Sequence, residues 1–71
     1  MFPHIKLLDT VALLSDLPDA GLRRGQVGTT VEHLAPDVFA VEFSDDQGRT
    51  YALVSIQVDV LLPLVYEAVG S

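Results

Sequence analysis

Apolar and polar residues alternate most clearly in the middle of the chain, where residues 38–44 read VFAVEFS. Phe39, Val41 and Phe43 fall on one side of an extended strand, because successive side chains of a strand point to opposite faces. A second strand-like stretch, residues 49–56 (RTYALVSI), follows the turn-forming residues DDQG. Two such stretches joined by a short, glycine-containing loop predict a β-hairpin.

The register of this hairpin follows if Ser44 is placed opposite Arg49. One face then pairs Phe43 with Thr50, Val41 with Ala52, and Phe39 with Val54. The other face pairs Glu42 with Tyr51, Ala40 with Leu53, and Val38 with Ser55. The first face contains both phenylalanines of the hairpin together with Val41, Ala52 and Val54, so we expect that face to form the core.

The rest of the chain predicts three further strands, at residues 9–14, 26–33 and 61–64. Gly25 and Gly28 accompany the second of these, and glycine permits positive φ or the close approach of a neighbouring strand. Residues 15–24 predict a long first loop, in which Leu17 and Leu22 fold back to cap the core. Residues 34–37 predict a turn, residues 57–60 a single 3-10 turn, and residues 65–71 a tail.

This order of strands, loops and turns is typical of one class of small β-barrel. We therefore predict an all-β fold, a small five-stranded SH3-like barrel with a long first loop and a single 3-10 turn before the last strand. A chain of 71 residues is expected to form a single domain over residues 1–71. The fold class does not by itself indicate a function.

The chain is acidic, with a formal net charge of −6 from 4 basic and 10 acidic side chains. Binding to nucleic acids or to anionic membranes depends on Lys and Arg, so we expect neither partner. Residues 1–6 do not resemble a secretory signal, and the longest apolar stretch, residues 60–66, is too short to span a membrane. Together with the lack of cysteine, these features favour a cytoplasmic location.

The sequence offers few candidates for catalysis or metal binding. His4 and His33 lack metal-ligand spacing, and no serine stands in a nucleophile-elbow pattern. We therefore expect no enzymatic activity, metal, cofactor or small-molecule substrate. Arg23 and Arg24 could clamp a carboxylate or phosphate, or could be a solvated pair that balances nearby acidic residues. The two aspartates of DDQG are explained more simply by turn chemistry than by calcium binding.

The outward side of the predicted hairpin is unusually apolar. We call it the outer hairpin face; its members are Val38, Ala40, Glu42, Tyr51 and Leu53. A hairpin ordinarily places polar residues outside, and an exposed apolar patch often marks a protein contact, with tyrosine as a frequent anchor. Alternatively, residues 65–69 of the tail or the N-terminal segment 2–8 cover this face within the molecule.

Several short motifs occur in an order that resembles a known bacterial family. They are LLDTVAL (7–13), LP (17–18), GL (21–22), RGQVGT (24–29), VE (31–32), VEF (41–43), Gly48, TYAL (50–53) and LLP (61–63). The pattern, which covers residues 5–64, resembles the small bacterial proteins of domain of unknown function DUF4926. The resemblance implies an SH3-like barrel without an established activity. It is also compatible with a role as the small partner of a neighbouring gene product, as an antitoxin or immunity protein is.

We therefore predict a non-enzymatic protein-interaction module that binds a protein partner or further copies of itself. The outer hairpin face, with Arg23 and Arg24, is the predicted contact surface, and acidic residues would steer a basic partner toward it. The alternative is an accessory nucleic-acid- or ribosome-associated barrel of the KOW type, suggested by the Gly-x-x-Gly-x-x-Val spacing of residues 25–31. That alternative relies on Lys6, Arg23 and Arg24 to contact phosphates.

Overall fold

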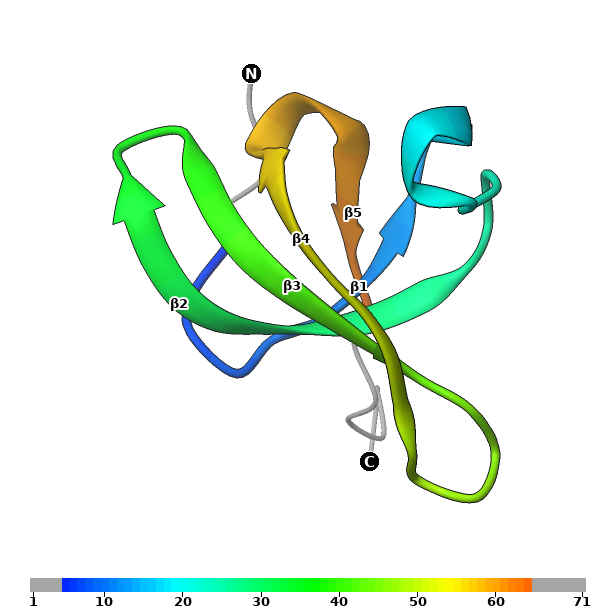
Figure 1. Cartoon of the computed structure of the whole chain (residues 1–71). Coiled ribbons are helices and arrows are strands. Elements are labelled where there is room, and N and C mark those ends of the chain that lie inside the picture. The colour runs from blue at the N-terminus through cyan, green and yellow to red at the C-terminus, as the bar shows by residue number, and fades with distance from the viewer. Residues whose placement is uncertain (1–4, 65–71) are drawn as a thin grey trace, which may run out of the picture.

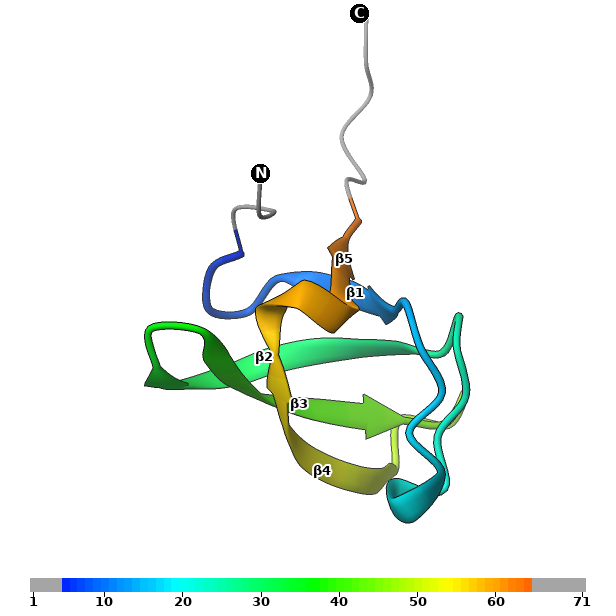
Figure 2. The same ribbon diagram turned by 90° about the horizontal axis from the view of Figure 1, so that it is seen from above.

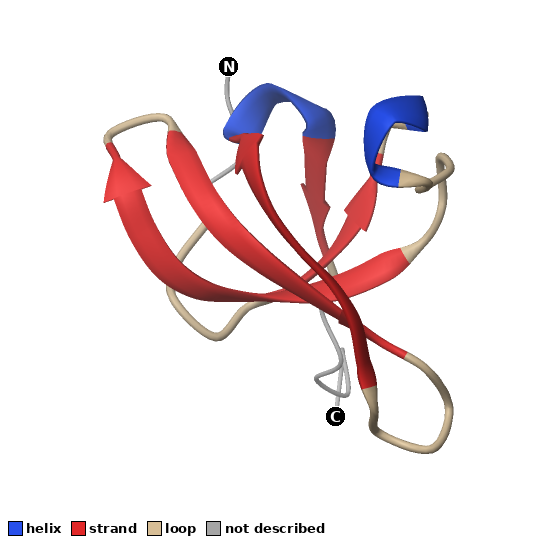
Figure 3. Ribbon diagram, in the orientation of Figure 1, coloured by secondary structure: helices blue, strands red, loops and turns tan. Residues whose placement is uncertain are grey.

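The computed structural model describes residues 5–64 as an antiparallel β-sheet with two short 3-10 helices (Figure 1). In chain order the elements are β1 (Thr10–Leu13), η1 (Pro18–Ala20), β2 (Val27–Ala35), β3 (Val38–Ser44), β4 (Thr50–Gln57), η2 (Val58–Val60) and β5 (Leu61–Pro63). All five predicted strands and the 3-10 turn before the last strand are confirmed. The other 3-10 helix, η1, lies in the long first loop, where the sequence predicted no helix; both helices are blue in Figure 3.

The strands are ordered β4-β3-β2-β1-β5 across the sheet. The predicted closure into a barrel is wrong: within residues 5–64, β4 and β5 are the two edges of the sheet and do not pair with each other. η2 carries the chain from one edge to the other (Figure 2). The long loop covers the core beside β4, and main-chain hydrogen bonds of 2.9 and 3.0 Å join Leu17 and Leu22 on either side of η1. Side chains of this loop therefore close the core where a further strand pair would close a barrel.

The core lies on the inner face of the curved sheet. Its buried members are Val11, Leu13, Leu22, Phe39, Val41, Phe43, Ile56 and Leu61. Leu22 is 2% exposed and Leu17 packs against this cluster, which confirms that the two leucines cap the core. The burial of alternate residues in β1 and β3 follows the period of two predicted from the sequence.

The β3–β4 loop closes one residue later than predicted. Main-chain hydrogen bonds join the Asp45 amide to the Arg49 carbonyl and the Gly48 amide to the Asp45 carbonyl, and Gly48 has a φ of 80°. Such a turn, completed by a left-handed glycine, is a common hairpin connection. Asp45 Oδ1 accepts the amides of Gln47 and Arg49 at 2.9 Å each, so this carboxylate serves the turn, as predicted for the DDQG aspartates.

A β-bulge at Tyr51 shifts the register a second time. Ser44 pairs with Thr50, but Phe43 pairs with Ala52, which leaves Tyr51 without an opposite residue. From Ala52 onward the predicted register is therefore wrong by two residues, and the predicted faces are kept there because two shifts of one residue restore the alternation. Thr50, which was predicted on the core face, is exposed and pairs with Ser44. The remaining pairs are Glu42–Leu53, Val41–Val54, Ala40–Ser55, Phe39–Ile56 and Val38–Gln57.

Two residues of β2 hold its neighbours close. A Cβ atom added to Gly28 would lie 2.8 Å from the Glu42 carbonyl oxygen, which confirms that this glycine permits close approach of β3. Thr30 is fully buried, and its Oγ1 donates to the Lys6 carbonyl at 2.6 Å and accepts from the Asp9 amide at 3.0 Å. This hydroxyl fastens the segment before β1 onto the sheet.

Candidate protein-interaction surface

The structure separates the outer hairpin face into exposed and covered members. Leu53 is 62% exposed, whereas Val38 and Glu42 are half-buried. Ala40 is only 8% exposed and cannot add contact area, which corrects its place in the predicted surface. Its methyl group lies on an interior strand, between the longer side chains of its register partners Glu32 and Ser55. The predicted surface is therefore narrower than the sequence indicated.

Tyr51 lies at the β-bulge and leans toward the end of the core rather than beside Leu53. Its ring centroid is 6.5 Å from that of the buried Phe43, and its hydroxyl accepts a hydrogen bond of 3.1 Å from Gln26 Nε2. The side-chain oxygen of Gln26 accepts the amide of Arg23 in turn. Tyr51 is half-exposed, but these contacts tie β4 to the end of the long loop and make it a structural link.

The candidate basic residues are not gathered in one place. Arg23 and Arg24 are exposed and follow η1, where the Arg24 amide donates to Asp16 Oδ1 at 2.8 Å. They lie near the Leu13 end of β1, and Lys6 lies near its other end. Three dispersed cations do not form the continuous basic face that nucleic-acid binding uses, so their placement gives the KOW-type alternative no support.

The candidate metal ligands that the structure describes do not gather at one site. Among residues 5–64, no group of three or more His, Asp or Glu side chains could hold a metal ion. His33 stacks on Phe39 with a centroid distance of 4.3 Å and an interplanar angle of 5°, so its ring packs as an aromatic side chain. His4 and the tail at 65–71 lie outside the described residues. The absence of enzymatic activity stays a prediction.

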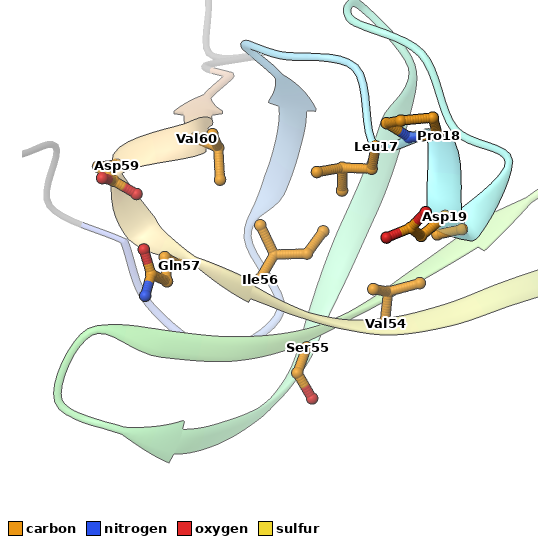
Figure 4. A pocket seen from close by; sticks show the side chains of 10 residues that line it. Leu17, Pro18, Asp19, Val54, Ser55, Ile56, Gln57, Asp59 and Val60 are labelled. Atoms are coloured by element: carbon orange, nitrogen blue, oxygen red, sulfur yellow. The ribbon is translucent and has the colours of Figure 1, made fainter.

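A groove that the sequence did not predict lies between η1 and the segment from β4 to η2 (Figure 4). We call it the η1–β4 groove. It has a volume of about 470 Å³ and is formed by residues 17–20 on one side and residues 54–57, 59 and 60 on the other. Figure 4 shows Leu17, Ile56 and Val60 directed into the groove. These apolar side chains give the groove a floor that resembles the core beneath it.

The local sequence explains why the groove is open. Pro18 begins η1, and Gly21, with a φ of 71°, ends it in the left-handed conformation that glycine favours. Leu17 and Leu22 anchor both ends of this short segment on the core, so η1 stands beside β4 without covering it. The length of the loop was the only sequence signal of a binding site here, since long loops often carry function.

The groove has acidic residues at its rim. Asp19 and Asp59 are exposed, and Figure 4 shows them on opposite sides of Ile56. Asp37 is also exposed and adjoins Asp59 in a smaller hollow of about 130 Å³. No Lys or Arg is among the described residues that line the groove. The rim therefore favours a positively charged ligand.

No helix among residues 5–64 is long and apolar enough to cross a membrane. A family model described as Domain of unknown function (DUF4926) matches residues 7–63. Neither the curated proteins nor the solved structures gave a match. The matched span includes all five strands and both walls of the η1–β4 groove. The chain therefore belongs to the DUF4926 family, as its motifs predicted.

Proposed function

We propose that the protein is a non-enzymatic protein-interaction module that contacts its partner through the β4 side of the sheet. The observation that carries this proposal is the η1–β4 groove, an open apolar groove that borders an edge strand. Grooves of this kind accept apolar side chains of a ligand, and edge strands readily pair with other chains.

Both faces of β4 add apolar area to this region. Val54 and Ile56 belong to the groove on the inner face. Leu53 lies on the outer face and is 62% exposed. Leu53 is thus the member of the predicted outer hairpin face that best fits the proposed contact region. The other exposed or half-buried candidates stay predictions as contact residues: Val38, Glu42, Tyr51, Arg23 and Arg24.

We also propose that the sheet is an open variant of the SH3-like class. The order of its elements supports this, with a long loop after β1 and a 3-10 turn directly before β5. In this proposal the long loop occupies the open side that a closed barrel would seal. A role as the small partner of another gene product, including an antitoxin- or immunity-like role, fits a binding module of this size and remains a proposal.

Affinity capture with a groove-filling variant tests the proposed function. Ala20 lines the groove, so Ala20→Phe should occupy it with an aromatic ring. Tagged wild type should enrich a defined partner from cells that express the native protein, and Ala20→Phe should lose it. Ala35→Phe is the matched control, because Ala35 is an exposed alanine at the β2–β3 turn, outside the groove.

Thermal melts must first show that both variants fold. Equal capture by the two variants, or no protein enriched by wild type, would contradict the proposed function. Light scattering over a concentration series identifies the case in which the partner is a second copy. In that case the dimer should form with wild type and Ala35→Phe, and Ala20→Phe should be monomeric.

A further inference from the structure

β4 has main-chain groups that are available for pairing. Among residues 5–64, only β3 is paired with β4. The Val58 amide donates to the Asp37 carbonyl at 2.8 Å on the β3 side. Since main-chain groups alternate in direction along an antiparallel strand, the amides of Leu53, Ser55 and Gln57 face away from β3. None of these three amides donates to another described residue outside the sheet.

The η1–β4 groove lies along this same edge. A strand added beside β4 would alternate its side chains between the two faces of the sheet. Side chains on the inner face would enter the groove beside Val54 and Ile56, while those on the outer face would lie next to Leu53 and Ser55. Main-chain pairing and apolar pockets for alternate side chains are the two components of peptide recognition by strand addition.

The acidic rim of the groove favours a ligand that carries positive charge. Asp19 and Asp59 stand at opposite sides of the apolar floor. A peptide that follows β4 therefore passes one carboxylate before it reaches the floor and the other after it leaves. Lys or Arg on both sides of a short apolar stretch would place an opposite charge near each carboxylate.

We propose that an extended segment of a partner protein adds to the free edge of β4, with apolar side chains in the η1–β4 groove and basic side chains beside Asp19 and Asp59. This inference rests on the proposed function and names the chemistry of the partner. A second copy of the chain is the less suitable occupant, because it carries a net charge of −6 and the same acidic rim.

Selection of a random-peptide library on the full-length protein tests the inference. We expect the enriched peptides to alternate apolar and polar residues, with Lys or Arg at both flanks and no proline in the centre. One enriched peptide is then synthesised with a fluorescent label, and its affinity is measured by anisotropy. N-methylation of a central residue that pairs with β4 should weaken binding by about tenfold, whereas N-methylation of its neighbour should not.

Two pairs of variants separate main-chain pairing from charge. Ser55→Pro removes an outward amide and should weaken the peptide about tenfold, while Ser55→Ala keeps that amide and should weaken it by less than about threefold. Asp19→Asn combined with Asp59→Asn should weaken binding roughly threefold, and less at high salt. Glu32→Gln combined with Asp46→Asn removes the same charge at exposed positions outside the groove and should have little effect.

The outcomes distinguish this inference from the proposed function. Failure to enrich any peptide, peptides without basic flanks, or full affinity of Ser55→Pro would overturn strand addition by a basic segment. A partner captured by wild type and lost from Ala20→Phe would still support the proposed function in each of those cases. Self-association through β4, detected by light scattering and abolished by Ser55→Pro, would overturn the inference in favour of a second copy.

Discussion

The two edge strands of the sheet, β5 and β4, differ in how many main-chain amides they leave free to pair with another chain. β5 has three residues, and the Leu64 amide that follows it donates to the Thr10 carbonyl at 2.9 Å on the β1 side. By alternation, Leu61 and Pro63 are the outward positions. The Leu61 amide donates to the Val58 carbonyl in the cap of η2, and proline has no amide hydrogen. β5 therefore offers no free outward amide, whereas β4 offers three.

This difference shows what an edge strand needs in order to be protected. Short length, proline and lysine are common means of preventing edge-to-edge pairing. β5 is short and contains a proline. β4 has eight residues, Thr50–Gln57, and contains neither proline nor lysine. One edge of this small sheet thus lacks outward amides for further pairing, whereas the other has them beside a groove that can accept side chains.

The largest expected effect comes from breaking the interior that both edges share. Val41 is fully buried on β3, so Val41→Asp should leave the protein unfolded at room temperature because the new carboxylate has no partner. Leu53→Asp is the control, since Leu53 is mostly exposed, and it should melt cooperatively near the wild-type temperature. Circular dichroism measures both, and a folded Val41→Asp would refute the assignment of faces in β3.

Proline substitutions at neighbouring positions of β4 test the direction of its amides. Val54→Pro should destabilise the fold by about 2–4 kcal/mol, because the Val54 amide faces β3 and its loss leaves a carbonyl of β3 without a hydrogen-bond donor. Ser55→Pro should cost about 1 kcal/mol or less, because its amide faces away from the sheet. Urea unfolding compares the two variants. Equal losses would mean that the β4 edge is not free.

A smaller effect is expected where the hairpin meets the long loop. Tyr51→Ala should cost about 1–2 kcal/mol, through loss of the packing against Phe43 and of the hydrogen bond from Gln26. Tyr51→Phe keeps the ring and should cost about 0.5 kcal/mol. Both values come from urea unfolding monitored by circular dichroism. If Tyr51→Ala were as stable as wild type, Tyr51 would be a free surface residue, as the sequence first indicated.

The smallest effect is expected at the protected edge. Pro63→Ser restores an outward amide to β5 but leaves the strand three residues long. The free energy of unfolding should change by less than about 0.5 kcal/mol. Light scattering should detect no new self-association. A dimer formed by this variant would mean that Pro63, rather than the short length of β5, protects the edge.

Most of the fold could be predicted from the sequence because its signals are local. The alternation of Phe39, Val41 and Phe43 identified the inner face, and the placement of Leu17 and Leu22 identified the cap. The bulge at Tyr51 could not be predicted, because residues 51–54 are all apolar and no polar residue or glycine among them marks the extra position. Two unrecognised shifts of the register cancelled, so the correct face was reached through a wrong pairing.

The groove and the open sheet could not be predicted because they depend on distant segments. Whether β4 and β5 pair depends on how the long loop packs, and no local pattern records that. The exposure of Leu53 was predicted, but the burial of Ala40 depends on neighbours contributed by β2 and β4. The floor of the groove consists of leucine, isoleucine and valine, which cannot be distinguished from core residues in the sequence.

The pairing of β5 with β1 also has a consequence for the kinetics of folding. It brings Pro63 opposite Val11 and Leu61 opposite Leu13, so the last described strand completes the first. Contacts between such distant parts of the chain form later than a local hairpin, because a long loop must close before they contribute. Leu61 is a fully buried core residue, so the core is incomplete until β5 has been synthesised and docked. We therefore expect the β3–β4 hairpin and its free edge to form before β5 docks.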